Sequence, residues 1–152
     1  MTQLTPNLAD NLAILREIVK ETYPESTIMQ DLCLAQAILE SRLLEAPSSL
    51  AMSPNNNLFG IKGQGTAGTV YLWTHEWIKG KEIQIKAGFA KNLSLNDSIA
   101  QHRHIMELDR YKRVWESKTF EDAANMIRIC GYATDPEYSK SLIVIYNQHI
   151  KL

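Results

Sequence analysis

Apolar residues recur at helical spacing in two stretches near the start of the chain, and each stretch predicts a helix. The first carries Leu8, Leu12, Leu15 and Val19. Thr5 is placed to cap this helix, and Pro6 falls at the first helical position, where proline is well tolerated. The second helix is predicted from about Thr27 to Leu44, and Pro47 ends it. Its apolar stripe consists of Met29, Leu32, Ala35 and Leu39.

The pattern changes after the second helix. From Pro47 to Gly68 the composition shifts to proline, serine, asparagine and glycine, which predicts a long structured loop. Loops of this length usually have a function. Between Thr69 and Phe89 apolar residues alternate with other residues around a Lys-Gly-Lys turn at residues 79–81. This stretch therefore predicts a hairpin or a small sheet.

Helical signals return in the second half of the chain. Ser94 and Thr119 each precede a helical pattern and are suited to cap a helix. Gly131 ends the second of these helices, and a last helix begins at residues 135–136 (Asp-Pro). The order of helices, a β segment and more helices predicts a mostly helical α+β domain, with a β lobe of about residues 69–89 at one side.

Length and charge limit the architecture and the partners. With 152 residues, 45% of them hydrophobic, the chain is long enough for one core and too short for two full domains, so we expect a single domain over residues 1–152. Sixteen lysines and arginines against seventeen aspartates and glutamates leave a net charge of −1. Because no strong positive field is present, we expect no nucleic acid among the partners.

Charged residues interrupt the apolar positions at the start of the chain, so we expect no signal peptide, and no later stretch is long enough to span a bilayer. These features predict a protein that is made in the cytoplasm and does not insert into a membrane. We also expect a monomer. Cys33 and Cys130 lie in apolar helical patterns without a partner at ligand spacing, and we expect them to be free thiols.

One carboxyl group on the second predicted helix is a candidate for acid catalysis. Cys33, Gln36, Ala37 and Glu40 share a helix face beside the apolar stripe, so Glu40 is expected at the margin of the core. Partial burial raises the pKa of a carboxyl group and keeps it protonated near neutral pH, as a general acid requires. The spacing alone does not separate this role from that of an ordinary surface glutamate near a helix end.

Three motifs change this interpretation. They are AQAILES at residues 35–41, NNLFGIKG at residues 56–63 and GYATDPEY at residues 131–138. Together with Thr-His-Glu-Trp at residues 74–77, they closely resemble the glucosaminidase family of peptidoglycan hydrolases, which includes autolysins and phage lytic enzymes. The resemblance covers roughly residues 28–150, and the joint occurrence of the motifs is a strong signal.

The resemblance implies a lysozyme-like helical body with a small β-hairpin lobe flanking a substrate groove. It also implies hydrolysis of the β-1,4 bond after N-acetylglucosamine in the peptidoglycan glycan strand, without a cofactor. On the family's motifs, Glu40 corresponds to the general acid, Glu76 to a second acidic residue on the β lobe, and Tyr132 to a tyrosine beside the cleft.

Candidates for binding the glycan strand are Gln36, Asn57, Phe59, Trp77 and Tyr138. Structural roles are the alternative for several of them. Asparagines such as Asn57 cap turns as well as bind sugar amides, and a structural role is favoured here. Phe59 is expected to anchor the loop in the core rather than touch sugar. Trp77 suits both sugar stacking and ordinary hairpin packing.

Histidines do not indicate a metal site. His102 and His104 are two residues apart on a predicted helix and point to different sides, and no aspartate or cysteine completes a ligand set. We therefore expect neither a metal nor another cofactor.

Glycosidic cleavage needs a proton for the departing oxygen and a partner for the oxocarbenium-like carbon. Glu40 can supply the proton. Glu76 can activate water, or the substrate's own acetamido oxygen can attack and leave Glu76 a supporting role, and the sequence leaves both open. A lytic transglycosylase with one glutamate and a catalytically silent wall-binding component are the alternatives. The preferred interpretation is a phage endolysin or similar lytic enzyme, acting on the cell wall in the periplasm or outside the cell.

Overall fold

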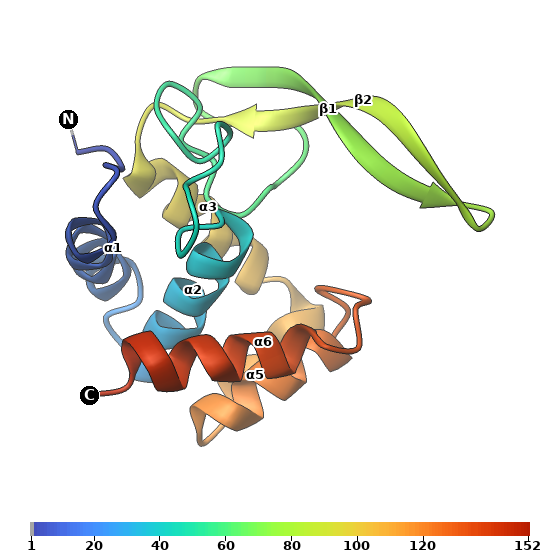
Figure 1. The fold of residues 1–152 in the computed structure, drawn as a ribbon. Coiled ribbons are helices and arrows are strands. Elements are labelled where there is room, and N and C mark those ends of the chain that lie inside the picture. Colours follow the sequence, from blue (N-terminus) through green and yellow to red (C-terminus); the bar gives the residue numbers. More distant parts are fainter. Residues whose placement is uncertain (1) are drawn as a thin grey trace.

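In the computed structural model, which describes residues 2–152, helices pack around one central helix and a long β-hairpin projects from this body (Figure 1). The helices are α1 (Leu8–Thr22), α2 (Thr27–Glu40), α3 (Leu95–Met106), α4 (Lys112–Trp115), α5 (Phe120–Ile129) and α6 (Tyr138–Ile145). A 3-10 turn η1 (Asp109–Tyr111) precedes α4, and a π-helical turn η2 (Tyr146–Ile150) follows α6. The predicted mostly helical α+β fold is confirmed.

Helix α2 is the centre of the body because it is buried on nearly every side. Its buried residues are Met29, Leu32, Cys33, Leu34, Ala35, Gln36, Ala37 and Ile38. Helices α1, α5 and α6 all pack against it. A helix that is buried over most of its circumference is held by the elements packed around it, so these contacts fix its position. Among residues 2–152, no helix combines the length and the apolar character needed to cross a membrane.

The starts of three helices test the capping predictions. The hydroxyls of Ser94 and Thr119 accept hydrogen bonds from backbone N–H groups in the first turns of α3 and α5, so both predicted caps are confirmed. The prediction for α1 was wrong. Asn7 caps this helix by accepting from the backbone N–H of Asp10, while Thr5 lies outside the helix. Asparagine is among the strongest capping residues, and it stands directly before the apolar repeat.

Helix α2 ends at Glu40, before the predicted end at Leu44. The chain leaves the helix because Arg42 adopts a left-handed backbone conformation with φ of 59°. Glu40 is thus the last helical residue, and its side chain stands at the edge of the body instead of along a continuing helix.

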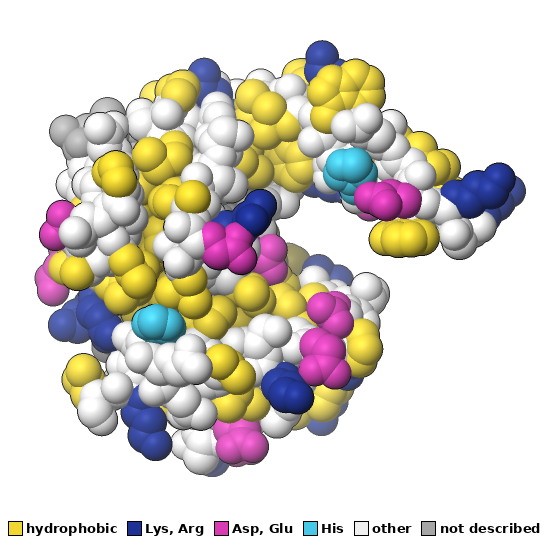
Figure 2. Space-filling model, in the orientation of Figure 1, with side chains coloured by type: hydrophobic (Ala, Val, Ile, Leu, Met, Phe, Trp, Pro, Cys, Tyr) yellow, Lys and Arg dark blue, Asp and Glu magenta, His cyan; other side chains and the backbone are white. Residues whose placement is uncertain are grey.

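The hairpin consists of β1 (Gly68–Ile78) and β2 (Lys81–Lys91). The strands pair antiparallel in unbroken register from Gly68 opposite Lys91 to Ile78 opposite Lys81. Lys79 and Gly80 form the turn, both with positive φ, as a tight two-residue hairpin turn requires. The predicted β lobe is confirmed. Figure 2 shows that an open notch separates this hairpin from the lower part of the helical body.

Asn57 fastens the long loop to the base of the hairpin. Its Nδ2 donates to the backbone oxygens of Ile61 and Ala90, both at 2.9 Å. Its Oδ1 accepts from the backbone N–H groups of Phe59 at 3.3 Å and Ile61 at 3.2 Å. The side chain is 1% exposed. Its hydrogen-bonding capacity is therefore used inside the protein.

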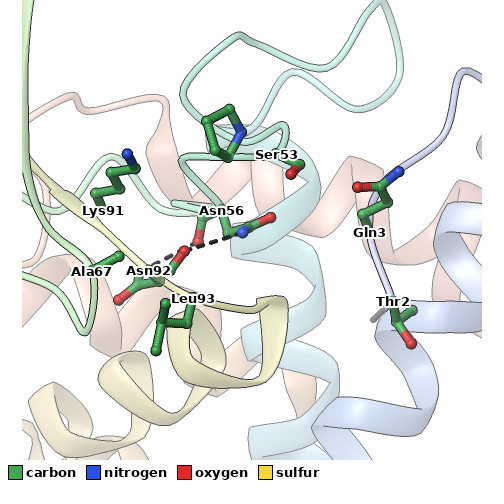
Figure 3. A pocket seen from close by; sticks show the side chains of 9 residues that line it. Thr2, Gln3, Ser53, Asn56, Ala67, Lys91, Asn92 and Leu93 are labelled. Atoms are coloured by element: carbon green, nitrogen blue, oxygen red, sulfur yellow. Dashed lines mark hydrogen bonds between the residues drawn. The ribbon is translucent and has the colours of Figure 1, made fainter.

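A cavity of about 460 Å³ lies between the N-terminal residues, the long loop and the end of β2 (Figure 3). Beside it, Asn56 Nδ2 donates to the backbone oxygen of Asn92 at 3.1 Å, and Asn92 Nδ2 donates to the backbone oxygen of Asn56 at 3.3 Å. This reciprocal pair joins the loop to the hairpin a second time. None of the candidate catalytic residues lines the cavity.

We predict that Asn57→Ala lowers the free energy of unfolding by at least about 2 kcal/mol, because it leaves several buried backbone groups without partners. Urea unfolding measures the loss. Asn55→Ala is the matched control, since Asn55 makes one side-chain hydrogen bond, to the backbone oxygen of Ser49. Equal losses in the two variants would contradict the anchoring role of Asn57.

Candidate active site

Glu40 lines two cavities at the C-terminal end of α2. The larger has a volume of about 660 Å³ and the smaller about 280 Å³. Tyr132 and Ala133 also line both, so the two cavities meet at Glu40 and at the loop that follows α5. A carboxyl group in this place can reach a bond that runs from one cavity into the other.

The cavity walls bring the sequence motifs together. The larger cavity is formed by the end of α2, the GYATDPEY segment and the start of α6, and its lining includes Arg42, Asp135 and Tyr138. The smaller is formed by the NNLFGIKG segment, α3 and η1, and its lining also includes Phe59, Gly60, Ile61, Ile105, Arg110 and Tyr111. Two distant motifs thus face each other across Glu40.

The Glu40 carboxyl is crowded by protein although its residue is exposed to solvent. The surrounding walls exclude part of its water, and this desolvation raises its pKa above the usual value. The nearby Tyr138 hydroxyl lowers the pKa of Glu40, with a smaller effect than desolvation. Glu40 is therefore more exposed than the sequence pattern predicted, while the shift of its pKa has the direction that a general acid needs.

Tyr132 and Tyr138 form a stacked pair beside Glu40, with ring centroids 6.0 Å apart and ring planes at 27°. Burial raises the pKa of both hydroxyls well above their usual value. Both groups consequently stay protonated and can donate a hydrogen bond to a carboxylate or to a sugar oxygen.

The residues predicted to bind the glycan lie in different parts of the structure. Phe59 and Tyr138 contribute to the cavity walls, although both are largely buried. Gln36 and Asn57 line neither cavity, and the side-chain amides of both make hydrogen bonds inside the protein. Trp77 lies on the hairpin and is 73% exposed.

Glu76 and Trp77 are neighbours on β1, so their side chains point to opposite faces of the hairpin. Neither lines the two cavities beside Glu40. The Glu76 carboxylate instead accepts from Lys62 Nζ, at 3.0 Å. The structure thus brings Glu40 together with Tyr132 and Tyr138, and it leaves Glu76 paired on the hairpin.

The Lys62–Glu76 pair reveals the shape of the hairpin. Lys62 forms a backbone bridge with Phe89, which stands opposite Val70. A straight strand would place Glu76 about 20 Å beyond Val70, out of reach of a lysine side chain. The hairpin must therefore curl toward the face that carries Glu76. Among residues 2–152, no other side-chain hydrogen bond or ion pair joins residues 70–87 to the rest of the molecule.

Sequence reasoning did not single out Arg110, which lines the smaller cavity. It belongs to η1, a turn too short to give a periodic signal. Its guanidinium lies over the Tyr111 ring, 4.7 Å from the centroid. Together with Arg42 in the larger cavity, it places one cation on each side of Glu40. Within residues 2–152, no group of three or more His, Cys, Asp or Glu side chains is arranged to hold a metal ion.

Comparison with known proteins gives consistent results. The family model for Glucosaminidase, described as mannosyl-glycoprotein endo-beta-N-acetylglucosaminidase, matches residues 16–151. The chain is 32% identical over 146 residues to the exo-glucosaminidase LytG of Bacillus subtilis, covering 92% of this chain and 50% of that protein. It is 31% identical over 155 residues to an autolysin of Enterococcus faecalis, covering 94% and 21%. The chain spans half or less of these curated relatives.

Solved structures share the fold. The catalytic domain of the autolysin Auto from Listeria monocytogenes has a TM-score of 0.81 at 27% identity, over 95% of this chain and 85% of that one. A C-terminally truncated glycoside hydrolase domain of FlgJ from Salmonella typhimurium has a TM-score of 0.73 at 27% identity, over 93% and 97%. The lysozyme-like architecture expected from the motifs is confirmed.

We predict that Lys62→Met lets the hairpin move without unfolding the body, because it removes the link between Glu76 and the long loop. An exposed ion pair contributes at most about 1 kcal/mol, so the melting temperature should change little. Lys86→Met is the matched control, since Lys86 lies on the opposite face of the hairpin from Glu76.

Spin labels at Gln84 on β2 and Glu121 on α5, in a Cys130→Ser background, report the position of the hairpin. The distance distribution should broaden in Lys62→Met and stay narrow in Lys86→Met. An unchanged distribution in Lys62→Met would show that the ion pair does not hold the hairpin.

Proposed function

The chain belongs to the glucosaminidase family, and we propose that it hydrolyses the glycan strand of bacterial peptidoglycan as an endo-β-N-acetylglucosaminidase. The observation that carries this proposal is the place of Glu40, a carboxyl group with a raised pKa where two cavities meet. A polymer that occupies both cavities passes its glycosidic oxygen beside this carboxyl. Such an arrangement suits cleavage within a strand.

Glu40 acts as the general acid in this proposal. Its protonated form donates to the departing glycosidic oxygen while positive charge develops on the neighbouring sugar ring. Tyr132 and Tyr138 hold the resulting carboxylate and contact the sugar on the larger-cavity side. Phe59 forms part of the wall on the other side.

Glu76 is the proposed second carboxylate. In an inverting reaction the two carboxyl groups lie roughly 6.5 to 9.5 Å apart, with the attacking water between them and the sugar. The curl of the hairpin turns the Glu76 face inward, and closure of the hairpin on bound glycan would bring Glu76 to the site. Attack by the substrate's acetamido oxygen is the second possible route, in which Glu76 only supports the charge.

The cellular role follows from the substrate. We propose a lytic enzyme that acts on the wall outside the cytoplasm, and the phage endolysin assignment and the monomeric state stay predictions. Relatives with names such as autolysin support the wall as the place of action. Trp77, exposed on the face of the hairpin opposite Glu76, would contact the glycan only if the strand continues around the outside of the hairpin.

Glu40→Gln should lower the turnover of purified peptidoglycan by roughly a hundredfold or more, because the amide keeps the shape but has no proton to transfer. Release of soluble muropeptides measures turnover, and the melting temperature checks folding. Glu17→Gln, which changes an exposed glutamate on α1, is the control and should stay fully active. Near wild-type turnover in Glu40→Gln would refute the assignment.

Glu76→Gln should also lose most turnover if Glu76 activates the water. Added azide should then restore part of the activity and yield a glycosyl azide of inverted configuration, because a small anion replaces the activated water. A Glu76→Gln variant as active as wild type would eliminate water activation by Glu76 and favour the acetamido route.

A further inference from the structure

Four side chains form a continuous chain of hydrogen bonds that ends at the Tyr138 hydroxyl, in the wall of the larger cavity beside Glu40. The Tyr23 hydroxyl lies 2.8 Å from His102 Nδ1, and His102 Nε2 lies 2.8 Å from Gln36 Oε1. Gln36 Nε2 donates to the Tyr138 hydroxyl at 3.0 Å, and Tyr138 lines the larger cavity together with Glu40. The members come from α1's C-cap, α3, α2 and α6, so the chain crosses the whole core.

The orientation of the Gln36 amide sets the direction of these bonds. An amide nitrogen only donates and an amide oxygen only accepts, so Gln36 Oε1 requires a proton on His102 Nε2. The neutral imidazole then presents a lone pair at Nδ1, which accepts from the Tyr23 hydroxyl. The Tyr138 oxygen accepts from Gln36, and its own proton is left for Glu40. The donors from Tyr23 to Gln36 therefore all point toward Tyr138, whose own proton stays available to Glu40.

His102 is able to hold this direction because it stays neutral. It is fully buried, and desolvation lowers its pKa to about 3. The rings of Phe59, Tyr23 and Tyr132 surround it, with centroids 4.6, 5.9 and 6.5 Å from its own. Its hydrogen-bonding partners are a tyrosine and a glutamine, neither of which carries a charge.

We propose that Gln36, His102 and Tyr23 are positioning residues, which act through the Tyr138 hydroxyl to orient and tune the Glu40 carboxyl. The inference rests on the proposed role of Glu40 as the general acid. Gln36, which the sequence predicted to bind the glycan, is thereby assigned a supporting role behind the site. None of the three lines the cavities, so none is expected to touch substrate.

A hydrogen-bond network that only stabilises the fold would not need its donors to point in this particular direction. Buried polar groups must be paired, but pairing is satisfied by either direction of the chain. With the Gln36 amide reversed, the Tyr138 proton would be used by Gln36 and lost to Glu40. The direction set by the Gln36 amide supplies a donor to the carboxylate that Glu40 becomes after proton transfer. The charged groups that share the cavities with Glu40 are Arg42, Asp135 and Arg110.

The tautomer of His102 tests the direction without any substitution. Long-range ¹H–¹⁵N spectra of the wild-type protein should show a neutral imidazole protonated at Nε2, unchanged between about pH 5 and pH 8. His75 and His104, which are exposed, give reference signals in the same spectra. A proton on Nδ1, or a charged imidazolium in this range, would overturn the proposal whether or not the protein degrades peptidoglycan.

Two substitutions of His102 test the effect on catalysis. Glutamine places an amide nitrogen near the position of Nε2 and can still donate to Gln36. Asparagine is shorter; it can accept from Tyr23 but does not reach Gln36. We expect His102→Asn to lower kcat about tenfold with little change in KM, the equivalent of one lost hydrogen bond. His102→Gln should recover most of this loss.

The pH profile separates positioning from a general loss of packing. Without an oriented donor the Glu40 carboxylate is less stabilised, so its pKa rises further. Because the acid must be protonated, the alkaline limb of kcat should move to higher pH in His102→Asn and not in His102→Gln. Equal kcat losses and unshifted profiles in both folded variants would contradict the proposal. If both fail to fold, Tyr23→Phe, which removes the first donor only, should show a smaller shift in the same direction, and an unshifted profile would contradict it.

Failure of the proposed function would look different. A wild-type protein without activity on peptidoglycan, or an active Glu40→Gln variant, would remove the role of Glu40 while leaving the tautomer of His102 as predicted. If only the positioning role fails, Glu40→Gln is still inactive, whereas His102→Asn and His102→Gln have equal kcat values and the same pH profile.

Discussion

Burial of helix α2 on nearly every side is the constraint on which the rest of the structure depends. Because α1, α5 and α6 all pack against it, α2 has no freedom to rotate or slide. Glu40 is its last residue and projects from a fixed support into the region where two cavities meet. In its proposed role as general acid, a carboxyl group held in this way needs no rearrangement when the proton is transferred. The same core also carries the polar chain through Gln36, so the support behind Glu40 is as fixed as its backbone.

The proposed second carboxylate, Glu76, is held in a different way. The side-chain amide of Asn57, with all its hydrogen bonds made, fastens the long loop to the base of the hairpin. Beyond that base, the two strands project away from the helices. Glu76 is restrained there by an exposed ion pair with Lys62, which is a weak contact. In the proposed mechanism, a rigid acid therefore works with a movable partner. Such a division suits a polymeric substrate, since the strand must enter from the side before the site can close.

Local patterns in the sequence predicted most of the fold. Period-two alternation found the hairpin, and helical periodicity found α2, because both signals arise within a few neighbouring residues. The end of α2 escaped prediction, since the left-handed turn at Arg42 is not a typical property of arginine. Glu40 was found through motif resemblance rather than burial. The role of Gln36 behind the site could not be predicted, because its partners His102 and Tyr138 come from elements far apart in the chain.

The central claim is that Glu40 transfers a proton to the glycosidic oxygen after N-acetylglucosamine and that water completes the reaction. Mass spectrometry of the soluble muropeptides, before and after borohydride reduction, tests it most directly. The account predicts fragments with a reducible N-acetylglucosamine at the new end. A new end at N-acetylmuramic acid would contradict the proposed bond, and an anhydro sugar that resists reduction would contradict hydrolysis.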